Sequence, residues 1–240
     1  KNIASLTKKI AALQSKTDLI VLPEMFTTGF SMEPANIAES MDGATVQWLR
    51  AMAAAYQAAI AGSVIIEDAG NYYNRFLLVH TNGVVDYYDK KHLFTLAGEH
   101  EIYTVGNELK TFELKGWKIR PMVCYDLRFP VWARNTDNYD LLIYVANWPS
   151  PRKKAWDTLL QARAIENMCY TIGVNRIGKD ANNMEYPGHS AVYDSLGATC
   201  LDFAEGFEGT GEVVISKEHL KKTRAKLNFL NDRDAFKIDN

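Results

Sequence analysis

The most constraining feature of the sequence is an apolar stretch that runs into a cysteine and then breaks. Residues 119–124 read as a strand that ends on Cys124, and the chain then breaks at Arg-Phe-Pro, residues 128–130. In open α/β sheets, ligands and reacting groups gather outside the carboxyl ends of the strands. A thiol at such a strand end is a candidate nucleophile, although most free cysteines are small buried packing residues. The stretch alone leaves both interpretations of Cys124 open.

The composition bounds the kind of protein to which this cysteine can belong. A chain of 240 residues with 47% hydrophobic content can form one α/β domain with a large core. Its 27 basic and 29 acidic residues give a net charge of −2, so there is no basic field for nucleic acid or for a membrane surface. The apolar runs at 19–23 and 141–146 are far shorter than the roughly 20 residues that cross a bilayer. We therefore expect a soluble protein that binds neither nucleic acid nor a membrane.

The cysteine content indicates a reducing compartment. Cys124, Cys169 and Cys200 match neither a disulfide framework nor a CxxC metal clamp. We therefore expect a cytoplasmic protein. Cys169 and Cys200 stand in apolar surroundings beside predicted strands, and we interpret both as packing residues.

The hydrophobic periodicity predicts alternating helices and strands. Apolar residues at three- and four-residue spacing predict helices over 3–13, 43–57 and 152–167, and Ser216 is expected to cap a short helix to Ala225. This alternation, with strands buried on both faces, is typical of a layered α/β domain. The short apolar runs that predict strands are 19–22, 61–67, 74–80, 84–88, 111–114, 119–124, 139–146, 170–176, 190–193, 198–203 and 209–215.

A polar stretch, 89–106, interrupts this pattern for about 18 residues without periodicity, and long loops of this kind inside compact domains tend to be functional. Lys90 lies near the start of the stretch, just past a predicted strand, and Glu24 and Cys124 likewise lie at or just past the ends of theirs. Three reactive residue types at strand ends can converge on one crevice. The stretch also carries further ionisable residues, namely Lys91, His92, Glu99, His100 and Glu101.

Four short motifs follow one another along the chain. They are Leu-Pro-Glu-Met-Phe around Glu24, Tyr-Asp-Lys-Lys-His-Leu-Phe around Lys90, Cys-Tyr-Asp-Leu-Arg-Phe-Pro from Cys124, and Ala-Asn-Trp-Pro at 146–149 followed by 161–167. In this order they resemble the glutamate, lysine and nucleophile motifs of the nitrilase superfamily of carbon–nitrogen hydrolases, and the pattern after its active-site strand. The resemblance covers nearly the whole chain. It implies one carbon–nitrogen hydrolase domain over 1–240, folded as a four-layer α-β-β-α sandwich of the nitrilase type.

The resemblance implies that Cys124 is the nucleophile, Glu24 the general base and Lys90 the electrostatic partner. The residue types suit these roles, because a carboxylate that takes the thiol proton activates the sulfur. The lysine ammonium, with a backbone N–H such as that of Tyr125, can stabilise the oxyanion of a tetrahedral intermediate. Glu24 would return its proton to the leaving amine and then activate the water that cleaves the thioester. This chemistry needs no metal and no cofactor.

Two of these assignments rest on spacing within the resemblance. The family's lysine stands two positions before the histidine of His-Leu-Phe, which selects Lys90 over Lys91. A second family glutamate stands seven positions before a glycine, and counting back from Gly106 gives Glu99, which would hold Lys90 or the attacking water by a charged hydrogen bond. Glu101 stays an alternative, because the loop departs from the usual spacing residues and lacks the family's proline before the glycine.

The other polar candidates have structural alternatives. His92 and His100 lie near the reactive loop, but lone histidines are more often hydrogen-bonded structural groups than substrate contacts. Arg128 either pairs with a buried acid such as Asp126 or Glu166, or binds a substrate carboxylate, and we favour the structural use.

The two ends of the chain carry expectations of their own. Family members begin with a central strand, whereas Lys1 already stands in the first predicted helix. Because losing a central strand would break ladder hydrogen bonds in the core, we expect residues to precede Lys1. The tail 226–240 carries Phe229, Leu230 and Phe236 among charges, without helical or strand period. The resemblance implies homodimers in which helices and C-terminal segments meet across a two-fold axis, and we expect a homodimer.

Two classes of function fit these observations: an amidase acting through a cysteinyl thioester, and a catalytically silent binding module. The three reactive residues together favour the enzyme. The lysine motif, the Glu-His-Glu loop and the stretches 147–149 and 229–234 look most similar to the omega-amidase branch, whose substrates are monoamides such as 2-oxoglutaramate and 2-oxosuccinamate. Another aliphatic amide or an N-carbamoyl compound is the alternative substrate.

A dicarboxylic monoamide requires a cation for its distal carboxylate as well as groups that act on the amide. Phe26, Tyr125 and Trp148 are candidate walls for this pocket. The candidate cations near predicted strand ends, among which the sequence does not choose, are Arg128, Arg152, Lys153 and Arg176.

Overall fold

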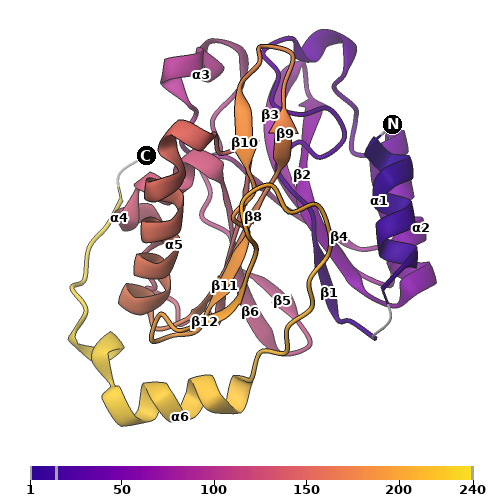
Figure 1. The fold of residues 1–240 in the computed structure, drawn as a ribbon. Helices are drawn as coiled ribbons and strands as arrows, with labels where there is room; N and C mark the ends of the chain where they lie inside the picture. The colour runs from indigo at the N-terminus through magenta and orange to yellow at the C-terminus, as the bar shows by residue number, and fades with distance from the viewer. Residues whose placement is uncertain (1, 14–15, 239–240) are drawn as a thin grey trace.

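Two β-sheets lie face to face between outer helices in the computed structural model, which describes residues 2–13 and 16–238 (Figure 1). The layers run helix, sheet, sheet, helix, and this confirms the expected four-layer sandwich. The predicted helix start at Lys1 and the last two residues of the tail lie outside the described residues.

The first sheet has the strand order β1-β2-β3-β4. β1 runs parallel to β2, whereas β2, β3 and β4 are successively antiparallel. The turn from β2 to β3 places Ala69 and Gly70 at positive φ. The bounds are Leu19–Val21 for β1, Ala59–Asp68 for β2, Asn71–Val79 for β3 and Val85–Asp89 for β4.

The second sheet has the order β12-β11-β8-β7-β6-β5, with a parallel centre and antiparallel edges. Its strands are β5 (Phe112–Leu114), β6 (Trp117–Val123), β7 (Leu141–Ala146), β8 (Tyr170–Asn175), β11 (Ala191–Tyr193) and β12 (Thr199–Asp202). A separate pair, β9 (Ile177–Lys179) and β10 (Glu185–Pro187), stands beyond the end of β8 (Figure 1).

Helices cover the outer face of each sheet. In Figure 1, α1 (Asn2–Ala11) and α2 (Ala44–Tyr56) flank the first sheet, and α5 (Lys153–Asn167) flanks the second. The shorter helices are α3 (Glu99–Ile102), α4 (Pro130–Ala133) and α6 (Lys217–Leu227). Ser216 caps α6 by accepting the His219 N–H at 3.1 Å, as predicted. Within the described residues, no helix is long and apolar enough to cross a membrane.

Side chains of the first sheet alternate between two cores, as the period of two in a strand requires. Ile60 and Leu77 face outward and share a cluster with Leu49 of α2. Phe76 faces inward, where its ring lies 6.4 Å from that of Phe112 in the second sheet. Because both faces are covered, the strands read in the sequence as unbroken apolar runs.

Three predictions about local structure are wrong. Residues 209–215 form no strand, because within the described ranges they pair with no strand, and Val214 is 96% exposed. The polar stretch 89–106 is not structureless, because it contains α3. The tail 226–240, in which no helical period was expected, is helical at its start, since α6 continues to Leu227 and a 3-10 turn follows at Phe229–Asp232.

Cys169 and Cys200, the two cysteines outside the candidate site, differ in their surroundings. Cys169 is buried against the core, as predicted. Cys200 is exposed, which corrects its interpretation as a packing residue. The reason is its place on β12, the edge strand of the second sheet, where three of the four residues are exposed.

The contact between β8 and α5 yields a prediction about packing. A Cβ at Gly173 would lie 2.3 Å from Leu160 Cδ1 and 2.9 Å from the Trp156 ring. We predict that Gly173→Ala destabilises the fold by about 1–3 kcal/mol through overpacking. Leu160→Ala alone should cost about 2–5 kcal/mol, because it leaves a cavity. The double variant should cost less than the sum of the two, since each change relieves the other.

Urea unfolding followed by circular dichroism measures all four proteins of this cycle. Strictly additive costs would contradict the close packing of Gly173 against Leu160.

Candidate active site

Cys124 stands where β6 ends and a 3-10 turn, Cys124–Arg128, begins. This confirms the predicted strand-end position. The cysteine has a φ of +45°, a left-handed conformation that is unfavourable for a residue with a Cβ. Such conformations persist where the surroundings over-determine them, and they cluster at functional sites.

A buried carboxylate holds this turn in place. Asp126 accepts the Val123 N–H at 2.9 Å, the Tyr88 hydroxyl at 2.9 Å and the His92 N–H at 3.0 Å. Its other contact is with His92 Nδ1, at 2.8 Å. Asp126 therefore ties the turn of Cys124 to β4 and to the segment that follows β4.

The two histidines of the stretch 89–106 do not line the cavity that contains Cys124. His92 pairs with Asp126, and its ring is stacked on that of Phe129 with centroids 3.7 Å apart, so its structural use is favoured. His100 is exposed on α3.

Three fully buried charges meet beside the cysteine. Lys90 Nζ lies 3.2 Å from Glu24 Oε1 and 2.9 and 2.8 Å from the two oxygens of Glu99. All three side chains have no exposed surface. Glu24 follows β1 after Leu22 and Pro23, Lys90 directly follows β4, and Glu99 opens α3. Two carboxylates around one ammonium leave the cluster with a net charge of −1.

The structure distinguishes the alternatives that spacing alone raised. Glu99 reaches Lys90, whereas Glu101 is exposed. Lys91 Nζ lies outside the cluster and contacts the side-chain oxygen of Asn107 at 3.2 Å. Lys90 and Glu99 are therefore the residues brought to Glu24.

The environment keeps Lys90 charged. Burial by itself lowers the pKa of Lys90, but the Glu24 and Glu99 carboxylates raise it more, and the net pKa lies above the ordinary lysine value. An ammonium that stays protonated is a fixed positive charge for a developing oxyanion.

The environment keeps the Cys124 thiol neutral. Burial raises the pKa of Cys124 well above its ordinary value, Glu24 raises it further, and Lys90 opposes these effects only in part. A thiol of this kind attacks only when a neighbouring group takes its proton as the bond forms. Glu24 is the carboxylate whose charge most affects this thiol.

Asparagine side chains hold the carboxylate of Glu24, and sequence reasoning assigned them no role. The Asn147 N–H donates to Glu24 Oε2 at 2.7 Å, and its side-chain amide donates to the same oxygen at 3.1 Å. The Asn74 amide donates to Glu24 Oε1 at 2.7 Å. The signals available in the sequence were that Asn147 follows β7 directly and that Asn74 interrupts a largely apolar strand.

Cys124, Glu24 and Lys90 line one cavity of about 1360 Å³. The cavity exceeds what a small amide fills, and it continues toward the segment 207–215. The four residues predicted to contact substrate all line it, namely Phe26, Tyr125, Arg128 and Trp148.

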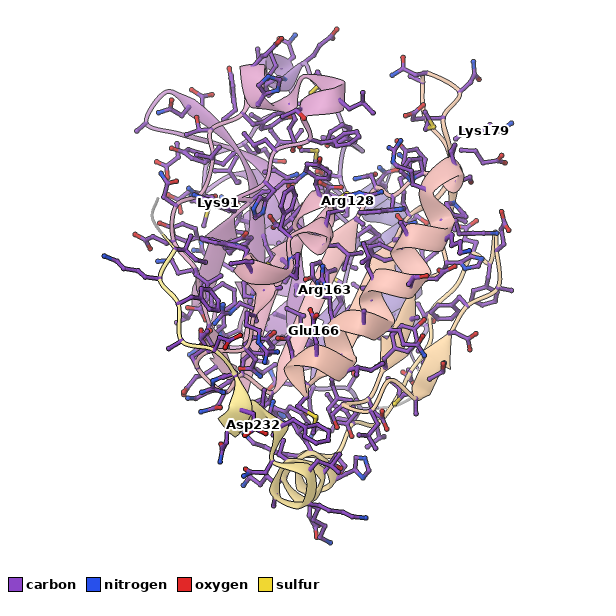
Figure 2. The ribbon with its side chains drawn as sticks, turned by 90° about the vertical axis from the view of Figure 1, so that its left-hand side faces the viewer. Lys91, Arg128, Arg163, Glu166, Lys179 and Asp232 are labelled. Atoms are coloured by element: carbon purple, nitrogen blue, oxygen red, sulfur yellow. The ribbon has the colours of Figure 1, made fainter. Side chains whose placement is uncertain are left out.

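The interpretation of Arg128 as the partner of a buried acid is wrong. Asp126 pairs with His92, and Glu166 pairs with Arg163 at 2.8 Å. Figure 2 shows Arg128 beside α5, with Arg163 nearer than Arg128 to Glu166. Within the described ranges Arg128 forms no ion pair, and its guanidinium lies 5.0 Å from the centre of the Trp148 ring.

The other candidate cations are engaged in different ways. Arg152 and Arg176 line the cavity, where they lie 5.0 Å from the Phe94 ring and 4.6 Å from the Tyr186 ring. Lys153 pairs with Glu205 at 2.6 Å at the surface, which removes it from the pocket.

Comparison with known proteins adds a family match and close relatives. The model of the carbon–nitrogen hydrolase family matches residues 1–225. The omega-amidase YafV of Yersinia enterocolitica is 47% identical over 219 residues, which cover 91% of this chain and 85% of that protein. The 2-oxoglutaramate amidase of Bacillus subtilis is 38% identical over 206 residues, covering 84% of this chain and 77% of that protein.

Among solved structures, XC1258 from Xanthomonas campestris superimposes with a TM-score of 0.93. It is 44% identical, and the match covers 99% of this chain and 92% of that one. XC1258 is described as a CN-hydrolase superfamily protein with an arsenic adduct in its active site.

Proposed function

The chain belongs to the carbon–nitrogen hydrolase family, and from this membership we propose that it is an omega-amidase acting through a cysteinyl thioester. Its substrates are small dicarboxylic monoamides of the 2-oxoglutaramate and 2-oxosuccinamate type, from which it releases ammonia. The observation that carries the proposal is the buried cluster of Glu24, Lys90 and Glu99 beside Cys124 on a cavity wall. Two relatives named for this activity support the substrate class.

In the first step, Cys124 Sγ attacks the amide carbon while Glu24 takes the thiol proton. The negative charge that develops on the carbonyl oxygen is stabilised by Lys90 Nζ and by the backbone N–H of Tyr125. Glu24 then transfers the proton to the amide nitrogen, the C–N bond breaks, and ammonia leaves a thioester on Cys124.

In the second step, Glu24 takes a proton from a water molecule as its oxygen attacks the thioester carbon. The resulting tetrahedral species occupies the same oxyanion site, and the C–S bond then breaks. The proton returns from Glu24 to the Cys124 sulfur, which restores the neutral thiol and releases the dicarboxylic acid. Glu99 holds Lys90 in position through both steps by its two charged hydrogen bonds.

Replacement of the reacting groups tests the mechanism. We predict that Cys124→Ala abolishes turnover with the fold intact, because little core volume is lost, and that Glu24→Gln and Lys90→Met each lower kcat by roughly 10³-fold or more. The losses should not add, because the groups act as one unit. Ammonia release measures turnover, and intact mass after brief exposure to substrate should show an acyl adduct on the wild-type protein but none on Cys124→Ala.

Circular dichroism is the control for folding of the three variants. Cys124→Ala that turned over within about tenfold of the wild-type rate would refute the thioester mechanism.

Arg128 is the candidate that best suits the distal carboxylate of the substrate. It lines the cavity, stands four residues after Cys124, and has no acidic partner within the described ranges. The Trp148 ring supports one face of its guanidinium at 5.0 Å, which leaves the planar edge for bidentate hydrogen bonds. Phe26 and Tyr125 line the same cavity.

A substrate panel tests this assignment. We predict that 2-oxoglutaramate and 2-oxosuccinamate are hydrolysed faster than glutamine, a neutral aliphatic amide or an N-carbamoyl amino acid. Arg128→Ala should raise the KM for both oxo-acid amides by about 10–100-fold, because a charged bidentate contact is lost, and should leave the neutral amide little changed. Lys153→Ala is the matched control, since Lys153 pairs with Glu205 at the surface.

Faster turnover of the neutral amide than of either oxo-acid amide would defeat the omega-amidase proposal and leave the thioester chemistry standing. Hydrolysis of another aliphatic amide or of an N-carbamoyl compound is then the function, and the large cavity accommodates either.

The homodimer and the cytoplasmic location belong to the same proposal. All three cysteines are free thiols, which suits a reducing compartment. Large apolar side chains are exposed on the helical side of the second sheet, where Val131 of α4 is 58% exposed and Ile165 of α5 is 49% exposed. Phe229 and Phe236 are also exposed. A two-fold contact would cover such surfaces.

Light scattering tests the homodimer. We predict a dimer mass at micromolar concentration, and a shift toward the monomer for Val131→Asp and Ile165→Asp, because each places a charge in a buried contact. Lys222→Asp on the exposed face of α6 is a control that should remain dimeric. A wild-type monomer at micromolar concentration would refute the expectation.

A further inference from the structure

Asn74 of β3 contacts both carboxylates of the buried cluster. Its Nδ2 donates to Glu24 Oε1 at 2.7 Å and to Glu99 Oε1 at 3.3 Å. Its backbone oxygen accepts the Lys90 N–H at 3.1 Å. The side chain is 1% exposed, so water does not replace these contacts. One residue thus touches every member of the charged cluster.

A second buried side chain fixes the orientation of this amide. Ser63 of β2 accepts the Met25 N–H at 2.9 Å, and its hydroxyl lies 2.9 Å from Asn74 Oδ1. The ionised carboxylates of Glu24 and Glu99 can only accept, so the Nδ2 group of Asn74 must face them and Oδ1 must face Ser63. Because Oδ1 can only accept, the Ser63 hydroxyl donates to it while the Ser63 oxygen accepts the Met25 N–H. The hydrogen-bond directions leave one orientation for Asn74.

We propose that Asn74 is a positioning residue for the reaction, and that it holds Glu24 and Glu99 ionised around Lys90 in an orientation set by Ser63. The proposal rests on the proposed role of Glu24 as general base. An amide N–H donates to a carboxylate and cannot accept from a carboxylic acid, so the contact favours the charged form of Glu24. After Glu24 has taken the Cys124 proton, the same contact favours transfer of that proton to the leaving nitrogen.

The charged and titratable groups around Glu24 come from four parts of the fold. Lys90 follows β4, Glu99 opens α3, and Cys124 follows β6. Tyr103 and Tyr186 lie near enough for the charge of Glu24 to raise the pKa of each, although burial is the larger cause. None of these residues donates an uncharged amide to Glu24. Asn147 does, but both of its contacts with the carboxylate are to Oε2, whereas Asn74 binds Oε1.

The test is the pH dependence of kcat/KM. We predict that Asn74→Ala moves the acidic limb of the profile upward by about 1 pH unit, because an ionised carboxylate loses one hydrogen bond. Ser63→Ala should move it in the same direction by less, and the double variant no further than Asn74→Ala alone. The rate of Cys124 alkylation by iodoacetamide should show the same shift, and this readout does not depend on the identity of the substrate.

Asn135→Ala is the matched control. Asn135 is also a fully buried asparagine, but its amide donates to the backbone oxygens of Tyr139 and Asn167. This variant should lower stability and leave the acidic limb in place. If Asn74 had only a structural role, Asn74→Ala would likewise lower stability and leave the acidic limb in place.

An acidic limb that stays in place in Asn74→Ala, with kcat reduced equally at every pH, overturns the proposal. If Asn74→Ala does not fold, the pH profile of Ser63→Ala is the test. An acidic limb of kcat/KM that stays in place in Ser63→Ala then overturns the proposal. These outcomes differ from failure of the proposed mechanism, which would instead appear as full turnover by Glu24→Gln.

Discussion

The structure depends on one ammonium group held between two buried carboxylates. Taking these charges out of water costs several kcal/mol for each ion, and only good geometry with further hydrogen bonds offsets that cost. Lys90 satisfies Glu24 and Glu99, while the remaining lone pairs of the carboxylates accept from Asn74, Asn147 and the Phe94 N–H. The cluster is therefore stable only in a fold that brings these donors together.

That requirement explains why two sheets are needed. Glu24 and Lys90 come from the first sheet, whereas the nucleophile and Asn147 come from the ends of β6 and β7 in the second. Asn147 donates both to the carboxylate and to the backbone oxygen of Glu24. Hydrogen bonds within the active site therefore connect the two sheets directly. Packing of the inner faces, with Phe76 against Phe112, sets the distance across which the reacting groups meet.

Residues whose roles follow from local pattern were predictable, and those whose roles depend on distant partners were not. Cys124, Glu24 and Lys90 stand at strand ends inside recognisable motifs. Asn147 also follows a strand inside one of the motifs, but its partner Glu24 lies 123 positions away, and the motif does not specify that partner. The strand expected at 209–215 failed for a related reason, because a short run of β-branched residues such as 213–215 does not specify a neighbour with which to pair. The prediction that Cys200 is a packing residue was wrong because the sequence of a strand does not show whether it lies at the edge or in the centre of a sheet.

The neutral state of the Cys124 thiol has a consequence for how the protein survives between turnovers. Peroxides and other oxidants react with the thiolate, so cysteines that are ionised at rest are the ones most readily converted to sulfenic acid. Here burial and the carboxylate of Glu24 keep the pKa of Cys124 high, and the sulfur becomes nucleophilic only when its proton moves to Glu24. The same electrostatics that make the cysteine dependent on a base therefore leave little thiolate for an oxidant to attack while no substrate is bound.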